Sequence, residues 1–461
     1  MEINKHLVVI CVLILGLWEV KFAQDSIPAG GAPKPFTLPK HETFQLKNGM
    51  RVTLVPYGEI PKVTVSAVVR SGSIDETENQ VWLASLTGVM MKEGTKTRTA
   101  TQLAEEASSM GGSLNVNVGT DTTSINGDVL SAFGPRFVML LADVMQRSAL
   151  PPSEMARLKN NLLRRLSIAK SQSGSLAYAQ FRQILYPNHP YGRVYSTEAM
   201  INSFAIEDVH GFYRQNFGAA RTHIYVAGKF DAAAMRKSIT QAFEGWSRGN
   251  DPITNIPKTA AKRTFQLIDR PNATQSTLNV GLPVIDPSNP DYIPFVVTNS
   301  LLGEAFSSRI TQNIRQNKGY TYAPWSQHSI RYRDAYWVEI ADVSTAVTGA
   351  SLKEIFYEID RLRKEVPSAE ELNGIKNYLV GSFVRNNSSR QGVIGQLSFA
   401  DLHGLQKDYL TTYVQKIMAV TPQDVQRIAQ LYIDPEKMTV VVVGDKAKIA
   451  EQIKPFATNE R

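Results

Sequence analysis

Two side chains able to do chemistry stand seven residues apart in the second half of the chain, Arg315 and Tyr322. The pattern predicts a short helix that ends at Gly319, with Arg315 in its last turn, followed by a strand that carries Tyr320 and Tyr322. Guanidinium and phenol groups both donate hydrogen bonds, so this pair can stabilise an oxygen that gains negative charge in a reaction. A structural alternative is that the arginine compensates the helix dipole and the tyrosine packs a half-buried face.

The length and composition set the frame for this pair. A chain of 461 residues is too long for one hydrophobic core, so two or more domains are expected. Hydrophobic residues make up 43% and charged residues 20%, as in a folded globular protein. The net charge of +8 is spread over the chain without a Lys/Arg run longer than two, which excludes a nucleic-acid-binding stripe.

The N-terminus predicts export. Lys5 and His6 precede an apolar run from Leu7 to Trp18, which is too short to span a bilayer and is typical of a signal peptide over residues 1–23. We expect a periplasmic protein with no membrane span after cleavage; the alternative is an uncleaved anchor. The single cysteine, Cys11, lies inside this run, so the mature chain has neither a disulfide nor a cysteine metal site. Residues 24–40, rich in Pro, Gly and Ala, predict an extended lead-in.

The elements that must position Arg315 and Tyr322 are grouped strands and helices, which predicts an α+β fold. The first half contains a hairpin around Asn48-Gly49 and a capping box at Thr99–Gln102. A polar segment at 248–262 predicts a linker between an N-terminal domain at 41–247 and a C-terminal domain at 263–461.

An internal repeat supports this division. Six residue pairs recur at a constant offset of 216, and the two halves open alike with Phe-Gln-Leu at 44–46 and 265–267. The six pairs are Asp208/Asp424, Val209/Val425, Phe217/Ile433, Arg221/Lys437, Val226/Val442 and Gly228/Gly444. We therefore predict two homologous domains in tandem, with ligands expected between them.

Several motifs in these domains carry a family resemblance that covers nearly the whole mature chain. They are Val89-Met-Met-Lys-Glu-Gly-Thr95, Met110-Gly-Gly-Ser-Leu-Asn115, Asn188-His-Pro-Tyr-Gly192, and Phe306-Ser-Ser-Arg-Ile310 continuing to Gly319-Tyr-Thr-Tyr322. The chain resembles the insulinase/pitrilysin family of zinc metallopeptidases in its two-domain form. The resemblance implies that each domain is a mostly antiparallel sheet packed with helices, and that the domains face each other around a peptide chamber.

The zinc site of that family is degenerate here. Its motif is His-x-x-Glu-His plus a distant Glu, in which three side chains hold zinc and the motif Glu is the general base. Aligned on Gly94-Thr95, the two His positions hold Ser85 and Val89, the general-base position holds Gly88, and the distant ligand position holds Arg165. No two of the seven histidines lie three to five residues apart, so the sequence predicts no zinc and no other cofactor in this chain.

The resemblance implies that the other half of the active site is kept. In the family an Arg and a Tyr seven residues apart bind the substrate carbonyl and the oxyanion, and here they match Arg315 and Tyr322. Arg309 is then expected to form a structural ion pair, and Tyr320 to pack. We expect the zinc-free subunit of an exported heterodimeric peptidase, inactive alone and active on peptides with a homologous subunit that carries zinc. The alternative is a non-catalytic scaffold or peptide-binding protein of the same fold.

Overall fold

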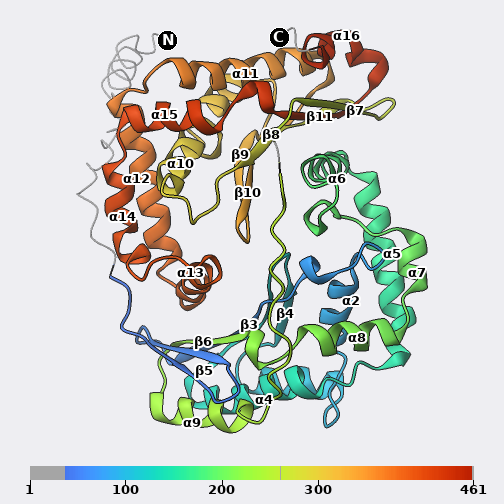
Figure 1. Ribbon diagram of the computed structural model, residues 1–461, viewed down its shortest axis with the longest axis vertical. Coiled ribbons are helices and arrows are strands. Elements are labelled where there is room, and N and C mark those ends of the chain that lie inside the picture. Colours follow the sequence, from blue (N-terminus) through green and yellow to red (C-terminus); the bar gives the residue numbers. More distant parts are fainter. Residues whose placement is uncertain (1–36, 260, 459–461) are drawn as a thin grey trace, which may run out of the picture. The chain divides into compact units, whose positions relative to one another are not determined.

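The computed structural model describes residues 37–259 and 261–458, so the predicted signal peptide lies outside the described residues. The first half forms a six-stranded sheet in the order β1-β2-β6-β3-β5-β4. Strands β3, β4, β5 and β6 of this sheet are labelled in Figure 1. Only the β2–β6 pair is parallel; the other neighbours are antiparallel. The strands are β1 Glu42–Gln45, β2 Arg51–Pro56, β3 Lys62–Val69, β4 Asn115–Val118, β5 Thr123–Leu130 and β6 Thr222–Gly228.

The second half repeats this arrangement in a five-stranded sheet of order β7-β11-β8-β10-β9. Its one parallel pair is β7–β11, which matches β2–β6, and the remaining pairs are antiparallel. The strands are β7 Thr264–Asp269, β8 Gln275–Val284, β9 Trp325–Arg331, β10 Asp334–Ser344 and β11 Thr439–Gly444. The predicted α+β class with two repeated, mostly antiparallel sheets is confirmed, whereas the domain limits at 41–247 and 263–461 stay a prediction.

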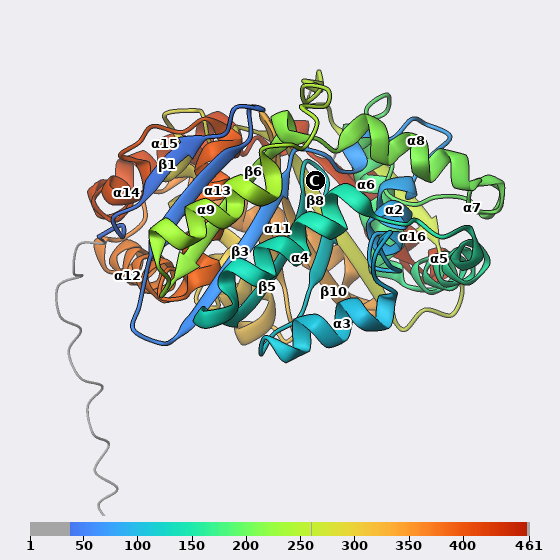
Figure 2. The same ribbon diagram turned by 90° about the horizontal axis from the view of Figure 1, so that it is seen from below.

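Helices cover these sheets and bury most of their apolar side chains in two cores, one for each sheet. Figure 2 shows α4 and α9 side by side across the first sheet. In the first half the longer helices are α2 Leu83–Met90, α3 Ala100–Ser109, α4 Gly134–Arg147, α5 Met155–Ser171, α6 Ser173–Leu185, α7 Glu198–Ser203, α8 Ile206–Asn216 and α9 Ala232–Phe243. In the second half they are α10 Tyr292–Asn299, α11 Thr348–Lys364, α12 Ala369–Asn386, α13 Arg390–His403, α14 Tyr409–Ala419, α15 Pro422–Tyr432 and α16 Lys446–Ala457.

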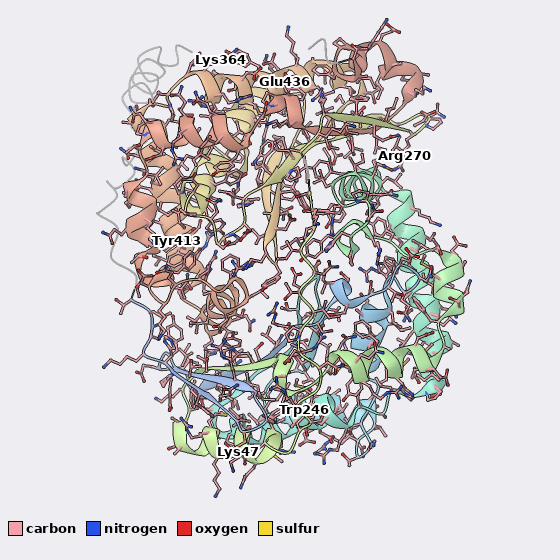
Figure 3. The ribbon with its side chains drawn as sticks, in the orientation of Figure 1. Lys47, Trp246, Arg270, Lys364, Tyr413 and Glu436 are labelled. Atoms are coloured by element: carbon pink, nitrogen blue, oxygen red, sulfur yellow. The ribbon has the colours of Figure 1, made fainter. Side chains whose placement is uncertain are left out.

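The local sequence signals of the first half form as predicted. Gly49 takes a φ of 94° in the β1–β2 turn, a conformation that glycine adopts without strain. The neighbouring Asn48 amide donates to the carbonyl oxygens of Phe243 at 2.7 Å and Trp246 at 3.1 Å, which fastens the hairpin to the end of α9 (Lys47 and Trp246 are labelled in Figure 3). The Thr99–Gln102 capping box starts α3.

One helix of each half packs on the sheet of the other half. Helix α6 lies against β8 and β11, and α13, the equivalent helix of the second half, lies against β3 and β6. Ion pairs reinforce the second contact: the Arg390 guanidinium donates to both carboxylate oxygens of Asp128, at 3.0 and 3.2 Å. The two halves are therefore joined by exchanged helices as well as by the connecting segment.

The structure corrects the predicted path of the chain around Arg315 and Tyr322. The predicted helix with Arg315 in its last turn is present as the π-helix η7 Thr311–Asn317, and Gly319 turns the chain after it with a φ of 63°. A second π-helix, η6 Ser300–Glu304, precedes it. Tyr320 and Tyr322 lie in a loop with one isolated bridge at Thr321, and not on a strand. The reason is Pro324, because a proline has no N–H for a strand ladder and β9 begins only after it.

Candidate functional site

The structure brings Arg315 and Tyr322 together beside η7. Arg315 lies in the last turn of this π-helix, a rare element that often marks functional positions. Its guanidinium carbon is 5.0 Å from the centre of the Tyr322 ring and 4.5 Å from the centre of the Phe306 ring. Tyr322 is 82% exposed. Both hydrogen-bond donors therefore stand close together at the surface of the second half.

Arg315 and its neighbour Arg309 differ in their partners among the described residues. Within residues 37–259 and 261–458, no carboxylate lies within ion-pair distance of the Arg315 guanidinium and no acceptor takes a hydrogen bond from it. Arg309 instead donates two parallel hydrogen bonds to Glu371, at 2.7 and 2.9 Å, and is buried. The predicted structural role of Arg309 is confirmed, and Arg315 keeps its donors available.

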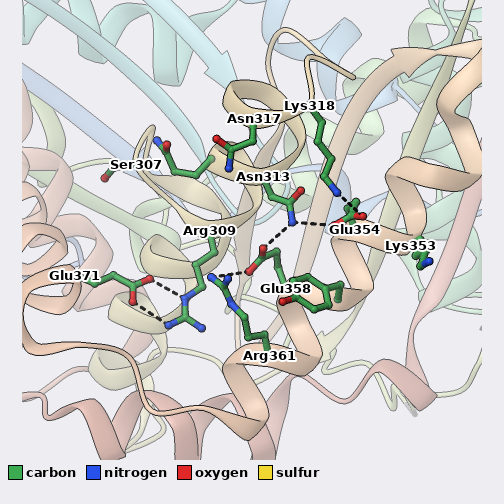
Figure 4. Close-up of a pocket in the computed structure, with 12 residues that line it drawn as sticks. Ser307, Arg309, Asn313, Asn317, Lys318, Lys353, Glu354, Glu358, Arg361 and Glu371 are labelled. Carbon is green, nitrogen blue, oxygen red and sulfur yellow. Dashed lines mark hydrogen bonds and ion pairs between the residues drawn. The ribbon is translucent and has the colours of Figure 1, made fainter.

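Polar side chains fasten η7 to helix α11 (Figure 4). The Asn313 amide donates to Glu354 at 3.0 Å and to Glu358 at 2.7 Å, and the Lys318 ammonium pairs with Glu354. Burial opposes ionisation of Glu354, but the hydrogen bonds from Lys318 and Asn313 outweigh it and hold the pKa of this carboxyl below its usual value. These contacts border a cavity of about 650 Å³ and fix the residues on both sides of Arg315.

The degenerate zinc-motif positions of the first half lie on α2. Ser85 is half-buried, Gly88 is buried and Val89 is 41% exposed. Strand β4 packs directly on this helix: a Cβ atom at position 88 would lie 2.4 Å from a methyl carbon of Val118. The Val118 side chain therefore crowds the point from which any side chain at position 88 would start.

Arg165 lies close to the start of the same helix. Its guanidinium carbon is 4.6 Å from the ring of Trp82, the residue that precedes α2, and the Trp82 indole donates to the Val194 carbonyl at 3.0 Å. The residue at the distant ligand position is thus a cation, and it lies beside the residue that precedes α2. The side chains at these positions do not fit a zinc ion, and no group of three or more His, Cys, Asp or Glu suited to a metal occurs among the described residues.

The sequence did not predict the roles of two residues in these regions, Glu76 and Phe306. Glu76 is buried before α2, where it accepts a hydrogen bond from the Ala84 N–H at 2.8 Å, and burial raises its pKa to about 7. In the sequence, Glu76 is only an acidic side chain ahead of a helix start. Such residues are common on protein surfaces, so the sequence does not indicate that this one is buried. Phe306 was quoted only as part of a family motif. Its contact with Arg315 joins a loop residue to the last turn of η7, and no sequence spacing predicts such a contact.

No helix in the described part of the chain has the length and apolar content needed to cross a membrane.

Comparisons with known proteins place this geometry in context. Residues 52–196 match the family model described as insulinase (peptidase family M16), and residues 203–379 match the model described as peptidase M16 inactive domain. An "uncharacterized zinc protease" of Rickettsia bellii is 25% identical over 328 residues, which cover 71% of this chain and 79% of that protein.

Solved structures share the fold. A peptidase M16 inactive domain from Pseudomonas fluorescens aligns with a TM-score of 0.81 and 22% identity, covering 88% of this chain and 98% of that one. The periplasmic protease PqqL from Escherichia coli aligns with a TM-score of 0.76 and 17% identity, covering 91% of this chain but only 47% of that one.

Proposed function

Because the chain belongs to the insulinase family of peptidases, M16, we propose that it is the non-zinc-binding subunit of an exported, heterodimeric peptidase of this family. The observation that carries the proposal is the state of the Arg315–Tyr322 pair. Both donors stand together at the surface, and the guanidinium has no carboxylate partner among the described residues. The crowded Gly88 and the cation Arg165 support the absence of zinc from this subunit.

Arg315 and Tyr322 would act on a peptide whose scissile bond lies at the zinc of a partner subunit. The guanidinium binds and polarises the substrate carbonyl, and the phenol donates a second hydrogen bond to the oxygen as it becomes an oxyanion. Such donors stabilise the transition state more than the ground state, because the charge they face grows during the reaction. Removing one of them typically lowers kcat by about 10²–10³-fold.

The length of one compared chain supports a partner of the same kind. This chain aligns with 47% of the Escherichia coli protease, so a second unit of similar size would complete a molecule of that length, whereas it covers 98% of the Pseudomonas fluorescens chain. We propose that the partner is a homologous subunit with an intact His-x-x-Glu-His motif. The periplasmic location of that protease and the apolar N-terminal run of this chain support export.

The test is to purify this chain, a homologous chain with the intact motif encoded beside it, and the co-expressed pair. We expect peptide hydrolysis by the pair only, and zinc bound by the partner only. Zinc-dependent hydrolysis by this chain alone would refute the proposal. Full activity of the pair after Arg315→Ala would favour the alternative, a scaffold or peptide-binding subunit that takes no part in the chemistry.

A further inference from the structure

Phe306 is a large apolar side chain left 61% exposed beside Arg315. It stands in the loop between the two π-helices, and that loop is fixed at both ends. The Ala305 N–H donates to the Ser300 carbonyl at 3.1 Å, and the Ser308 N–H donates to the Ala305 carbonyl at 2.8 Å. The bidentate Arg309–Glu371 pair anchors the next turn. The ring is therefore held at the surface by its backbone and not by burial.

The ring faces the guanidinium of Arg315, with 4.5 Å between the guanidinium carbon and the ring centre, and Tyr322 adds a second ring at 5.0 Å. An aromatic face attracts a cation through its quadrupole without accepting any of its N–H hydrogen bonds in the guanidinium plane. A carboxylate also orients an arginine, but it neutralises the charge and occupies the fork of donors, as Glu371 does to Arg309. Aromatic contacts therefore orient Arg315 while its charge and its donors remain free.

We propose that Phe306 is a positioning residue that holds the Arg315 guanidinium ready for the substrate oxygen. This inference rests on the proposed function of Arg315 as a donor to the oxyanion. Phe306 acts through Arg315 and touches no reacting atom. Its contribution is the pre-organisation of a flexible cationic side chain, so it is expected mainly in kcat.

The contact itself is tested in the isolated chain, without a partner or an activity. Arginine side chains are labelled with nitrogen-15, and the Nε–Hε resonance of Arg315 is assigned by its loss in Arg315→Lys. Phe306→Ala is expected to shift this resonance because the ring current is lost, whereas Phe306→Tyr leaves it close to the wild-type position. An unchanged resonance in Phe306→Ala would overturn the proposal. Tyr378→Ala is the matched control, because Tyr378 is an exposed aromatic residue on α12.

The function of the contact is tested by peptide hydrolysis with the assembled pair of subunits. Phe306→Ala is expected to lower kcat/KM by about 3- to 30-fold, with KM little changed. Phe306→Tyr is expected to retain most of the wild-type kcat/KM, because it keeps the aromatic face. Phe306→Leu keeps apolar bulk without an aromatic face and should behave like Phe306→Ala. Phe306→Glu should be slower still, since a carboxylate there pairs with Arg315 and neutralises it. Tyr378→Ala is expected to leave kcat/KM unchanged.

A double-mutant cycle decides whether Phe306 acts through Arg315. In an Arg315→Ala background, Phe306→Ala is expected to cause no further loss. An equal loss in both backgrounds would overturn the proposal, because it would mean that the ring acts on the substrate or on the fold directly. If Arg315→Ala alone leaves kcat unchanged, the proposed function fails, and the Arg315 resonance still reports separately whether the contact exists.

Discussion

Substitution of Gly88 measures how much space remains at the general-base position of the degenerate motif. Alanine in a helix interior is normally more stable than glycine by about 1 kcal/mol. Here the new Cβ would lie 2.4 Å from a methyl carbon of Val118 and 3.4 Å from one of Val116. Valine side chains are short and stiff, so the strand or the helix must move, and overpacking of this kind costs about 1–3 kcal/mol. Gly88→Ala should therefore change the free energy of unfolding by between about 0 and −2 kcal/mol.

The matched control is Gly381→Ala on α12. Gly381 is also in a helix interior, but it is exposed and a Cβ there would meet no atom within 4 Å. It should gain about 1 kcal/mol, so the two alanine variants should differ by about 1–3 kcal/mol. Val118→Ala removes the clashing methyl groups, and in that background Gly88→Ala should become stabilising.

The assay is urea unfolding followed by circular dichroism, with the slope of the transition compared between variants so that a shift in midpoint reports stability. Equal stabilisation by Gly88→Ala and Gly381→Ala would refute the reasoning. It would show that position 88 has room for a Cβ atom, and that Val118 does not crowd it.

Three further predictions concern titration, the junction of the halves and the anchor of η7. Burial raises the pKa of Glu76 in the folded state to about 7, above its ordinary value of 4.5, so between these pH values the folded state binds a proton that the unfolded state has lost. The free energy of unfolding should therefore fall as pH rises from about 5 to 8 in the wild type but not in Glu76→Gln, as measured by the midpoints of urea unfolding. Arg390→Ala breaks a partly exposed bidentate pair with Asp128, so it should cost about 1 kcal/mol and speed hydrogen exchange in α13. Arg309→Lys loses the fork that Glu371 accepts and should cost about 1.5–3 kcal/mol, measured by thermal unfolding.

Much of the fold could be predicted because its signals are local or repeated. The hairpin at Asn48-Gly49 and the Thr99–Gln102 box depend on residues a few positions apart, and both form as predicted. The constant offset of 216 anticipated that α8 and α15 are equivalent, and their bounds, Ile206–Asn216 and Pro422–Tyr432, keep that offset.

The parts that could not be predicted depend on contacts between distant residues or on backbone geometry without a sequence signal. No periodicity distinguishes the π-helices η6 and η7 from ordinary helices, and Pro324 displaces the start of the strand beyond Tyr322. The packing of α6 and α13 on the sheet of the opposite half depends on tertiary contacts, which helix propensity does not determine. The crowding of position 88 by Val118 could not be predicted, because it depends on how β4 packs against α2, and the sequence does not indicate that packing.

The measurement that tests the central claim most directly is kcat of the assembled pair with Tyr322→Phe in this subunit. The change removes one hydroxyl from a side chain that is 82% exposed and has no hydrogen-bond partner for it among the described residues, so folding and assembly should be unaffected. We predict a loss in kcat of about 10²–10³-fold with an unchanged dissociation constant for the partner. A kcat equal to that of the wild-type pair would contradict the assignment of Tyr322 as an oxyanion donor.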